Sequence, residues 1–359
     1  MRVVVVGAGI VGASTAFHLV EAGVETIVVD QRHPGAASMA GAGIVCPWPT
    51  SATDPDFVAL YCAGAGATAR LVDRLTELGE TDTGYGRVGA IVLAQPGETA
   101  DAELDATERL VRSRSTPDSD AGEITRLDGA ECQERFPPLR DDHPGLFIGG
   151  AARLDGRRLT QALVRAARIE PRVGHIELDV ADGRARGIVL EGERIGADAV
   201  VVAGGAWTAD LLTAHHVTVD VEPQKGQLVH LRVTGPDGTP AATGGWPTIL
   251  PPGPHYLVPF DDGRVVCGAT RETGSGFDTE VTVGGQREVL AAAIRWAPGL
   301  ADAAIVETRV GLRPLARSGR PTIGPAPGVD RLHVGTGMGA GGLTIGPHAG
   351  RLLADHVLA

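Results

Sequence analysis

The sequence lacks three features that would each indicate a whole class of protein. Its four cysteines lie far apart and form no C-x-x-C pair, which argues against a zinc site or a redox dithiol. No apolar run reaches the roughly 18 residues that a membrane-spanning helix needs. Basic residues are outnumbered by acidic ones, and the formal net charge of -12 argues against nucleic acid or an anionic membrane surface as a main partner.

Two further expectations follow from length and from the start of the chain. A predicted strand beginning at Arg2 leaves no room for a signal peptide ahead of it, so we expect a cytoplasmic protein with no membrane span. A chain of 359 residues without internal repeats suits a cofactor domain joined to a substrate domain. The oligomeric state stays open, with a homo-oligomer allowed.

Glycine, in contrast, is abundant. It accounts for 51 of the 359 residues, about twice its usual share. The glycines gather at 7–12, 35–43, 204–205 and 335–342, near both ends of the chain and in its middle. A single ligand held by distant segments would explain this distribution.

The first glycine cluster follows a predicted strand, precedes a predicted helix and has the pattern G-x-G-x-x-G. In this pattern Gly7 makes a tight turn, Gly9 lets backbone N–H groups approach a pyrophosphate, and Gly12 lets the helix pack closely on the strand. Asp30 ends the next strand, where a carboxylate can accept a hydrogen bond from a ribose hydroxyl. The motif predicts a dinucleotide, with a structural glycine turn as the alternative, but does not separate NAD from FAD.

Two other segments favour FAD over NAD. Small residues fill the run from Gly35 to Gly41 and leave room for a longer ligand, although a plain loop is the alternative. A second glycine-rich run, from Gly337 to Gly342, precedes the last predicted helix. Its backbone N–H groups and the positive helix end would stabilise the anion that a flavin forms on accepting a hydride.

Hydrophobic periodicity and capping residues predict alternating strands and helices. Helices are expected over 11–22, 56–78, 155–168, 285–296 and 346–358, the last with Pro347 in its first turn. Strands are expected over 2–6, 25–30, 89–94, 195–203, 217–233, 256–270, 306–310 and 332–335, with a loop over 113–122. This is an α/β fold: a Rossmann-like FAD-binding domain (1–50, 145–212 and 305–359) interleaved with an α+β substrate domain built on an antiparallel sheet (51–144 and 213–304).

An ordered series of motifs along almost the whole chain resembles the FAD-dependent family that contains glycine oxidase, sarcosine oxidase and D-amino-acid dehydrogenase. The motifs lie at 7–12, 203–207, 256–259 with 268–270, 311–314 with 319–324, and 337–344. The resemblance implies an FAD site lined by Ile10, Val11, Asp30, Gln31, Ala36, Ala37, Ser38, Ala40 and Gly41, with Val173 at the adenine and Ala203, Gly204 and Trp207 beside it. It also implies that the flavin edge meets Met338, Gly339, Ala340, Gly341, Gly342, Leu343 and Thr344.

Covalent attachment of the flavin is not expected. No cysteine lies near Met338 and no histidine lies beside Ser38, where some relatives form such links. The resemblance therefore implies a non-covalent FAD.

Three residues are candidates for the chemistry. By resemblance, Arg313 binds the substrate carboxylate through two parallel hydrogen bonds, and the hydroxyl of Tyr256 meets the same carboxylate. A structural salt bridge and a core tyrosine are the respective alternatives. Arg271 falls beside the flavin face, where relatives carry Met or Lys, and three roles stay open: promoting oxygen reduction, binding a second acidic group, or pointing into solvent. No metal site and no general base are assigned.

The resemblance implies FAD-dependent oxidation of the C–N bond of a small amino acid or N-substituted glycine to an imine. The hydride passes to flavin N5, and O2 is the expected electron acceptor. A D-amino-acid dehydrogenase that passes electrons to a quinone or carrier is one alternative. A non-catalytic flavin-binding subunit of an amine-oxidising complex is another.

Overall fold

The computed structural model describes residues 1–359, and its first sheet is built around the amino-terminal β-α-β unit. That unit consists of β1 (Arg2–Val6), α1 (Ile10–Glu21) and β2 (Glu25–Asp30). The valines of β1 are buried, as both faces of a parallel sheet are covered. The six strands run in the order β19-β20-β12-β1-β2-β8, parallel except for the β19–β20 pair. The other four strands are β8 (Arg172–Val173), β12 (Ala199–Val202), β19 (Thr322–Pro325) and β20 (Leu332–Thr336).

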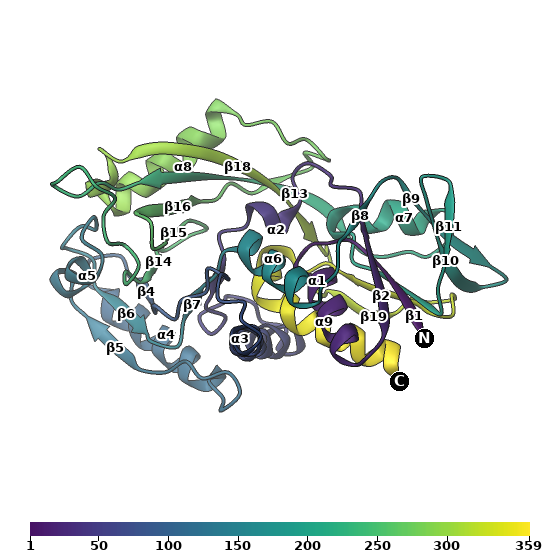
Figure 1. The fold of residues 1–359 in the computed structure, drawn as a ribbon. Helices are drawn as coiled ribbons and strands as arrows, with labels where there is room; N and C mark the ends of the chain where they lie inside the picture. The colour runs from purple at the N-terminus through teal and green to yellow at the C-terminus, as the bar shows by residue number, and fades with distance from the viewer.

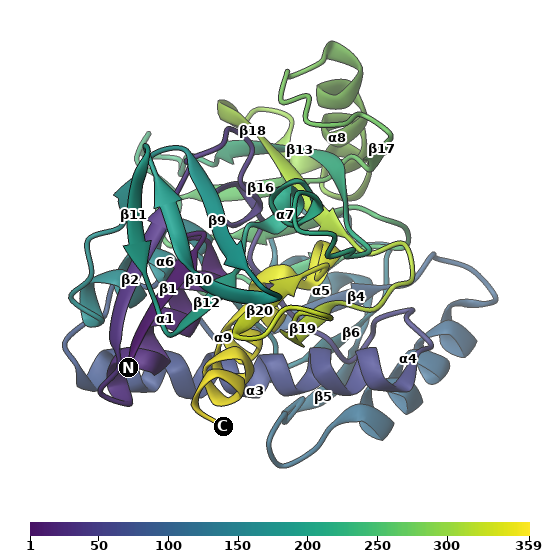
Figure 2. The same ribbon diagram turned by 90° about the vertical axis from the view of Figure 1, so that its right-hand side faces the viewer.

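Helices cover one face of this sheet and a small sheet covers the other (Figure 2). On the helical side α1 packs against α6 (Gly156–Ala166) and α9 (Gly342–Leu358), and α3 (Pro55–Glu77) packs on α9. On the opposite face lies a three-stranded antiparallel sheet of β9 (Ile176–Ala181), β10 (Arg184–Leu190) and β11 (Glu193–Gly196). The short α7 (Thr208–Thr213) follows β12.

A second, nine-stranded sheet lies beside the first (Figure 1). Its path is β17-β13-β16-β15-β14-β4-β6-β5, with β18 also paired to β13, and every pair is antiparallel except β14–β4. The strands are β4 (Ala90–Leu93), β5 (Ile124–Leu127), β6 (Gly145–Ile148), β13 (Glu222–Arg232), β14 (Thr248–Leu250), β15 (Tyr256–Pro259), β16 (Arg264–Gly268), β17 (Glu272–Thr273) and β18 (Ala304–Leu315).

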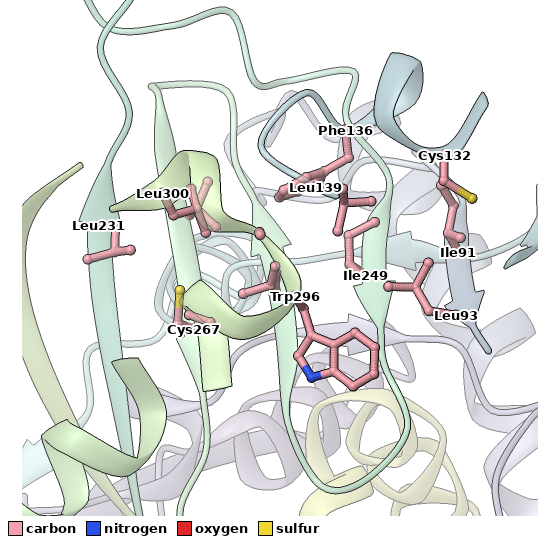
Figure 3. Close-up of a cluster of buried hydrophobic side chains, with 14 of the residues drawn as sticks. Ile91, Leu93, Cys132, Phe136, Leu139, Leu231, Ile249, Cys267, Trp296 and Leu300 are labelled. Atoms are coloured by element: carbon pink, nitrogen blue, oxygen red, sulfur yellow. The ribbon is translucent and has the colours of Figure 1, made fainter. Parts of the chain in front are cut away.

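The outer face of the second sheet is closed by an apolar core. Helix α8 (Val283–Trp296) packs against β13 and β16, and α5 (Gly129–Arg135) lies further along the sheet. Trp296, Phe136 and Ile249 belong to the cluster of buried side chains shown in Figure 3. With its outer face filled, this sheet turns its inner face toward the first sheet. The remaining elements are α2 (Ala37–Ala40), α4 (Ala100–Arg114), β3 (Ile44–Val45) and β7 (Ala152–Arg153).

The predicted α/β architecture is confirmed, but two predicted elements are wrong in detail. The single parallel strand expected over 195–203 is two strands, because β11 ends at Gly196 in the antiparallel sheet and β12 begins at Ala199. Asp198 separates them and accepts a hydrogen bond from the backbone N–H of Arg2 at 2.8 Å. Helix α9 begins at Gly342, so Pro347 lies inside the helix and not in its first turn.

Sheet pairing also places several segments differently from the predicted domain boundaries. The segments that begin at 145 and 305 are predicted to belong to the FAD-binding domain, yet β6, from Gly145, and β18, from Ala304, both pair within the nine-stranded sheet. Conversely α3, predicted in the substrate domain, packs on α9 and α6. The chain therefore crosses between the two sheets more often than the sequence pattern indicates. None of the helices combines the length and the apolar character needed to cross a membrane.

Candidate functional site

A cavity of about 520 Å³ lies where the carboxyl ends of the parallel strands face the second sheet. Its lining includes Val6 at the end of β1, Asp30 at the end of β2 and Thr336 at the end of β20, together with residues of β13, β15 and β18. Ligands of open α/β sheets bind at this edge. All four glycine clusters of the sequence contribute to the lining.

Two glycines of the first glycine loop have no space for a side chain. A Cβ atom on Gly7 would lie 2.3 Å from the carbonyl oxygen of Ala203, and one on Gly12 would lie 1.8 Å from the carbonyl oxygen of Gly7. Gly9 is the N-cap of α1 and offers no side chain to cap it, while the N–H of Ile10 donates to Ser38 Oγ at 2.9 Å. The amino end of α1 therefore opens on the cavity, and such an end favours an anion.

Asp30 is fixed beside this loop. Its carboxylate accepts hydrogen bonds from the backbone N–H of Ala8 at 2.6 Å and of Arg32 at 2.5 Å. A carboxylate has about four acceptor positions, so Asp30 can still accept from a ligand hydroxyl. Because Asp30 also lines the cavity, its position suits a ribose.

A second helix end faces the cavity from the other end of the chain. Gly341 is the N-cap of α9 and makes no side-chain cap. The lining residues of this segment are Met338, Gly339, Ala340, Gly342 and Leu343. The cavity thus has the positive ends of two helices on its wall.

Most of the predicted cofactor-binding residues lie on this one wall. Besides those of the second helix end, the lining contains Gly7, Gly9, Ile10, Val11, Asp30, Gln31, Ala36, Ala37, Ser38, Ala40, Gly41, Ala203, Gly204 and Trp207. The sequence places these residues in four separate segments, and the strand order β20-β12-β1-β2 brings their ends together.

Four predicted residues do not line the cavity. Gly12 packs against Gly7, and Gly341 lies beside Tyr61. The hydroxyl of Thr344 donates to the carbonyl oxygen of Ile44 at 2.8 Å and so faces the protein interior. Val173 is 46% exposed on the edge strand β8, where it pairs with Asp30, and Ile176 lines the cavity instead.

Arg313, Tyr256 and Arg271 lie together at the side of the cavity formed by the second sheet. Nη1 of Arg313 donates to the carbonyl oxygen of Thr270 at 3.0 Å and to Gln224 Oε1 at 3.4 Å. Both acceptors are uncharged, so the guanidinium keeps its positive charge unmatched. The salt bridge considered as an alternative for Arg313 is not formed.

Two buried glycines lie beneath these side chains: Gly268, which belongs to the motif at 268–270, and Gly226, which no motif of the sequence contains. A Cβ atom on Gly226 would lie 2.4 Å from Nη2 of Arg313, and one on Gly268 would lie 2.6 Å from the hydroxyl of Tyr256. The pairing of Gln224 with Arg313 and of Tyr256 with Gly268 creates these contacts. No local signal indicates the role of Gly226, because Gly226 and Arg313 lie far apart in the sequence and meet only when β13 pairs with β18.

The phenol of Tyr256 is a hydrogen-bond donor at neutral pH. Burial raises the pKa of Tyr256, and the nearby positive charge of Arg313 offsets this only in part. The hydroxyl therefore keeps its proton and can donate to an anion bound by Arg313.

Comparison with known proteins identifies the family. Residues 2–356 match the family model described as FAD dependent oxidoreductase (DAO). The chain belongs to this family. It is an FAD-dependent oxidoreductase, and the predicted cofactor and family resemblance are confirmed.

Relatives of the DAO family match over nearly the full length. The chain is 42% identical to the uncharacterized oxidoreductase YurR of Bacillus subtilis, over 99% of this chain and 94% of the relative. It is 31% identical to a glycine oxidase of Pseudomonas aeruginosa, with the same shares covered. The crystal structure of an iminodiacetate oxidase from Chelativorans sp. BNC1 superimposes with a TM-score of 0.94 at 46% identity, covering 99% of this chain and 95% of that one.

The residues present fit FAD. The glycine loop at α1 suits a pyrophosphate, Asp30 suits a ribose, and the amino end of α9 would stabilise negative charge on a reduced flavin. Trp207 lies between His33 and Phe277, with ring centroids 4.6 Å and 5.3 Å away in stacked arrangements. Phe277 comes from the second sheet's connections, so this stack ties the two halves of the molecule together beside the cavity.

One cysteine unexpectedly lines the cavity of this FAD-dependent oxidoreductase. Cys46 is buried, and burial raises the pKa of its thiol, with the neighbouring Cys62 adding to the effect. A protonated thiol is a poor nucleophile. Cys46 therefore gives no reason to expect a covalent link to the flavin.

Proposed function

We propose that this protein oxidises the C–N bond of a small amino acid or N-substituted glycine to an imine, which water then hydrolyses. The observation that carries the proposal is Arg313, whose guanidinium lines the FAD cavity without a carboxylate partner. When bound, FAD supplies the hydride acceptor. The names of the glycine oxidase and iminodiacetate oxidase relatives support this substrate class.

In this proposal, the residues of the chain act by positioning. Arg313 holds the substrate carboxylate through a bidentate pair of hydrogen bonds, and Tyr256 donates a further one. Thr270 and Gln224 accept hydrogen bonds from Nη1 of Arg313 and so restrict the orientation of the guanidinium, and they leave Nη2 and Nε for the substrate. Fixing the carboxylate directs the neighbouring C–H toward the cofactor. Holding two reactants close together in the right orientation can supply a large part of the rate enhancement of an enzyme.

The first prediction tests Arg313 by anaerobic bleaching of the flavin absorbance with glycine and N-methylglycine. In Arg313→Gln, the rate of bleaching at fixed substrate should fall by roughly 100-fold, because hydrogen bonds to a charged group are the stronger kind. Arg317→Gln is the matched control: Arg317 follows the same strand, and its side chain is 72% exposed. An unchanged rate in Arg313→Gln would refute the role assigned to Arg313, whereas no bleaching of the unsubstituted protein by any amine would favour a non-catalytic flavin-binding subunit.

We further propose O2 as the electron acceptor. Admitting air to the bleached protein tests this in the same experiment. Rapid recovery of the flavin band with formation of hydrogen peroxide supports an oxidase. Recovery only with an added quinone would indicate a dehydrogenase instead.

A further inference from the structure

The substrate side of the cavity carries two positive charges and no negative one. Arg271 and Arg313 both line it, and the only carboxylate of the whole lining is Asp30, which is bound by the glycine loop at α1. Neither arginine forms a salt bridge, although the chain has 44 acidic residues against 32 basic ones. Two unmatched guanidiniums at one site attract an anion with more than one charge.

The acidic neighbour of Arg271 is engaged elsewhere. Glu272 accepts hydrogen bonds from Gln227 Nε2 at 2.8 Å and from Thr270 Oγ1 at 2.5 Å, and it lies 3.7 Å from Lys225 Nζ. The backbone carbonyl of Thr270, next to Arg271 on the other side, is bound by Arg313. The side chain of Arg271 is exposed and remains free to meet a ligand.

The two arginines and Tyr256 come from neighbouring parts of the second sheet. Arg313 lies on β18, Arg271 follows the end of β16, and Tyr256 opens β15, which pairs with β16. All three side chains line the same cavity, and the positive charges of both arginines oppose the rise in the pKa of Tyr256 that burial causes. A substrate carboxylate held by Arg313 and Tyr256 would leave Arg271 for a second anionic group further along the same molecule.

We propose that Arg271 is a specificity-determining residue that binds the second carboxylate of a dicarboxylic secondary amine. This inference rests on the proposed function. The substrate class is an N-(carboxyalkyl)glycine: Arg313 holds the glycine carboxylate, and Arg271 holds the carboxylate on the other arm of the nitrogen. Iminodiacetate is the simplest compound of this class.

The reaction balances with the acceptors already named. Iminodiacetate loses a hydride from one methylene carbon and a proton from nitrogen, which forms the C=N bond and reduces FAD by two electrons. Water adds to the imine, and the C–N bond breaks to give glyoxylate and glycine. Transfer of the two electrons to O2, with two protons, gives hydrogen peroxide.

The test compares iminodiacetate with N-methylglycine, which has the same amine but only one carboxylate. The unsubstituted protein should use iminodiacetate with a kcat/KM at least about tenfold higher. In Arg271→Gln, kcat/KM for iminodiacetate should fall by roughly 10- to 100-fold more than that for N-methylglycine, mainly through KM, since a charge-assisted contact is lost. Arg271→Lys, which retains the charge, should recover part of the preference, and Arg317→Gln should retain all of it.

A binding measurement without turnover separates recognition from chemistry. Thiodiacetate has sulfur in place of the amine and cannot form an imine, and methylthioacetate is its one-carboxylate counterpart. Calorimetric titration of the FAD-loaded protein should show tighter binding of thiodiacetate, and Arg271→Gln should abolish that difference.

Each remaining outcome has one meaning. If kcat/KM in Arg271→Gln falls equally for both amines, or if the preference for iminodiacetate is unchanged, the inference is overturned. If instead the reduced flavin of Arg271→Gln reacts more slowly with O2 whichever amine reduced it, Arg271 acts in oxygen reduction. Bleaching by N-methylglycine but not by iminodiacetate would overturn the inference and leave the proposed function standing. If no amine bleaches the flavin, the proposed function itself is wrong.

Discussion

Two buried glycines of the second sheet occupy positions at which any side chain would displace the groups proposed to hold the substrate. Gly226 lies under the guanidinium of Arg313 and Gly268 lies under the ring of Tyr256. Gly226 lies on β13, which pairs with β18, the strand of Arg313. Gly268 lies on β16, which pairs with β15, the strand of Tyr256. The fit of the substrate therefore depends on atoms that do not touch the substrate.

A methyl group at Gly226 tests this dependence. In Gly226→Ala the added Cβ would meet three guanidinium atoms of Arg313 at 2.4–2.6 Å, so the arginine must move. We expect kcat/KM for amine oxidation to fall by about 100-fold, since a misplacement of about 1 Å in a positioning group has this order of effect. Gly284→Ala is the control, because a Cβ there meets nothing within 4 Å. Kinetics equal to those of the control would contradict the positioning role.

For single residues, the sequence predicts a role when the residue's partners lie close to it in the sequence, and misses the role when the partners lie far away. Gly7, Gly9 and Gly12 are recognisable because their spacing along six residues is itself the signal. Gly226 has no such signal, since its partner Arg313 meets it only after β13 and β18 have paired. Val173, which the resemblance places at the adenine, lies on the edge strand β8 with an exposed side chain, and its role stays a prediction.

Among the elements, the crossing of α1 and α9 positions both helix ends that open on the cavity. Gly346 and Gly350 let the helices approach closely: a Cβ atom would lie 2.7 Å from Ile10 Cγ2 and 2.5 Å from Ser14 Cβ, respectively. The hydroxyl of Ser14 also donates to the carbonyl oxygen of Pro347 at 2.9 Å. This contact holds the first and last glycine-rich segments in a fixed relation.

Gly350→Ala should therefore weaken the fold. Overpacking at such a contact costs about 1–3 kcal/mol, and the midpoint of urea unfolding should fall accordingly. The neighbouring Arg351→Ala is the control, as its side chain is 48% exposed and should change stability by no more than about 0.5 kcal/mol. Equal unfolding midpoints for the two variants would show that the helices can separate without cost.

The elements also show why some boundaries could not be predicted. An apolar run from Ile195 onward resembles one buried strand, yet it contains a change of sheet at Ala197 and Asp198 that only tertiary pairing reveals. Pro347 normally indicates a first turn, but the glycine run ahead of it is already helical. Strand β18 continues to Leu315 because its long partner β13 supplies hydrogen bonds along the whole length.

For the whole molecule, the cavity is a meeting point of two sheets, so bound FAD should stabilise the fold as a unit. Acid precipitation should release the flavin into the supernatant, as expected for a non-covalent cofactor. Adding FAD back to the apoprotein should raise the melting temperature. At a free FAD concentration of a hundred times Kd, the free energy of unfolding should increase by about 2.7 kcal/mol. NAD at the same concentration should give no shift. Flavin that stays in the pellet would disprove non-covalent binding.

The position of β1 has a consequence for how the protein is made. β1 is synthesised long before β12, which is its neighbour in the interior of the sheet. The wall of the cavity is completed only by the segment from Met338 to Leu343, which comes later still. Until β12 is made, β1 can pair on one side only, with β2, and FAD can enter a finished site only after the segment from Met338 to Leu343 has been made. Cofactor supply can stabilise completed chains but cannot rescue incomplete ones.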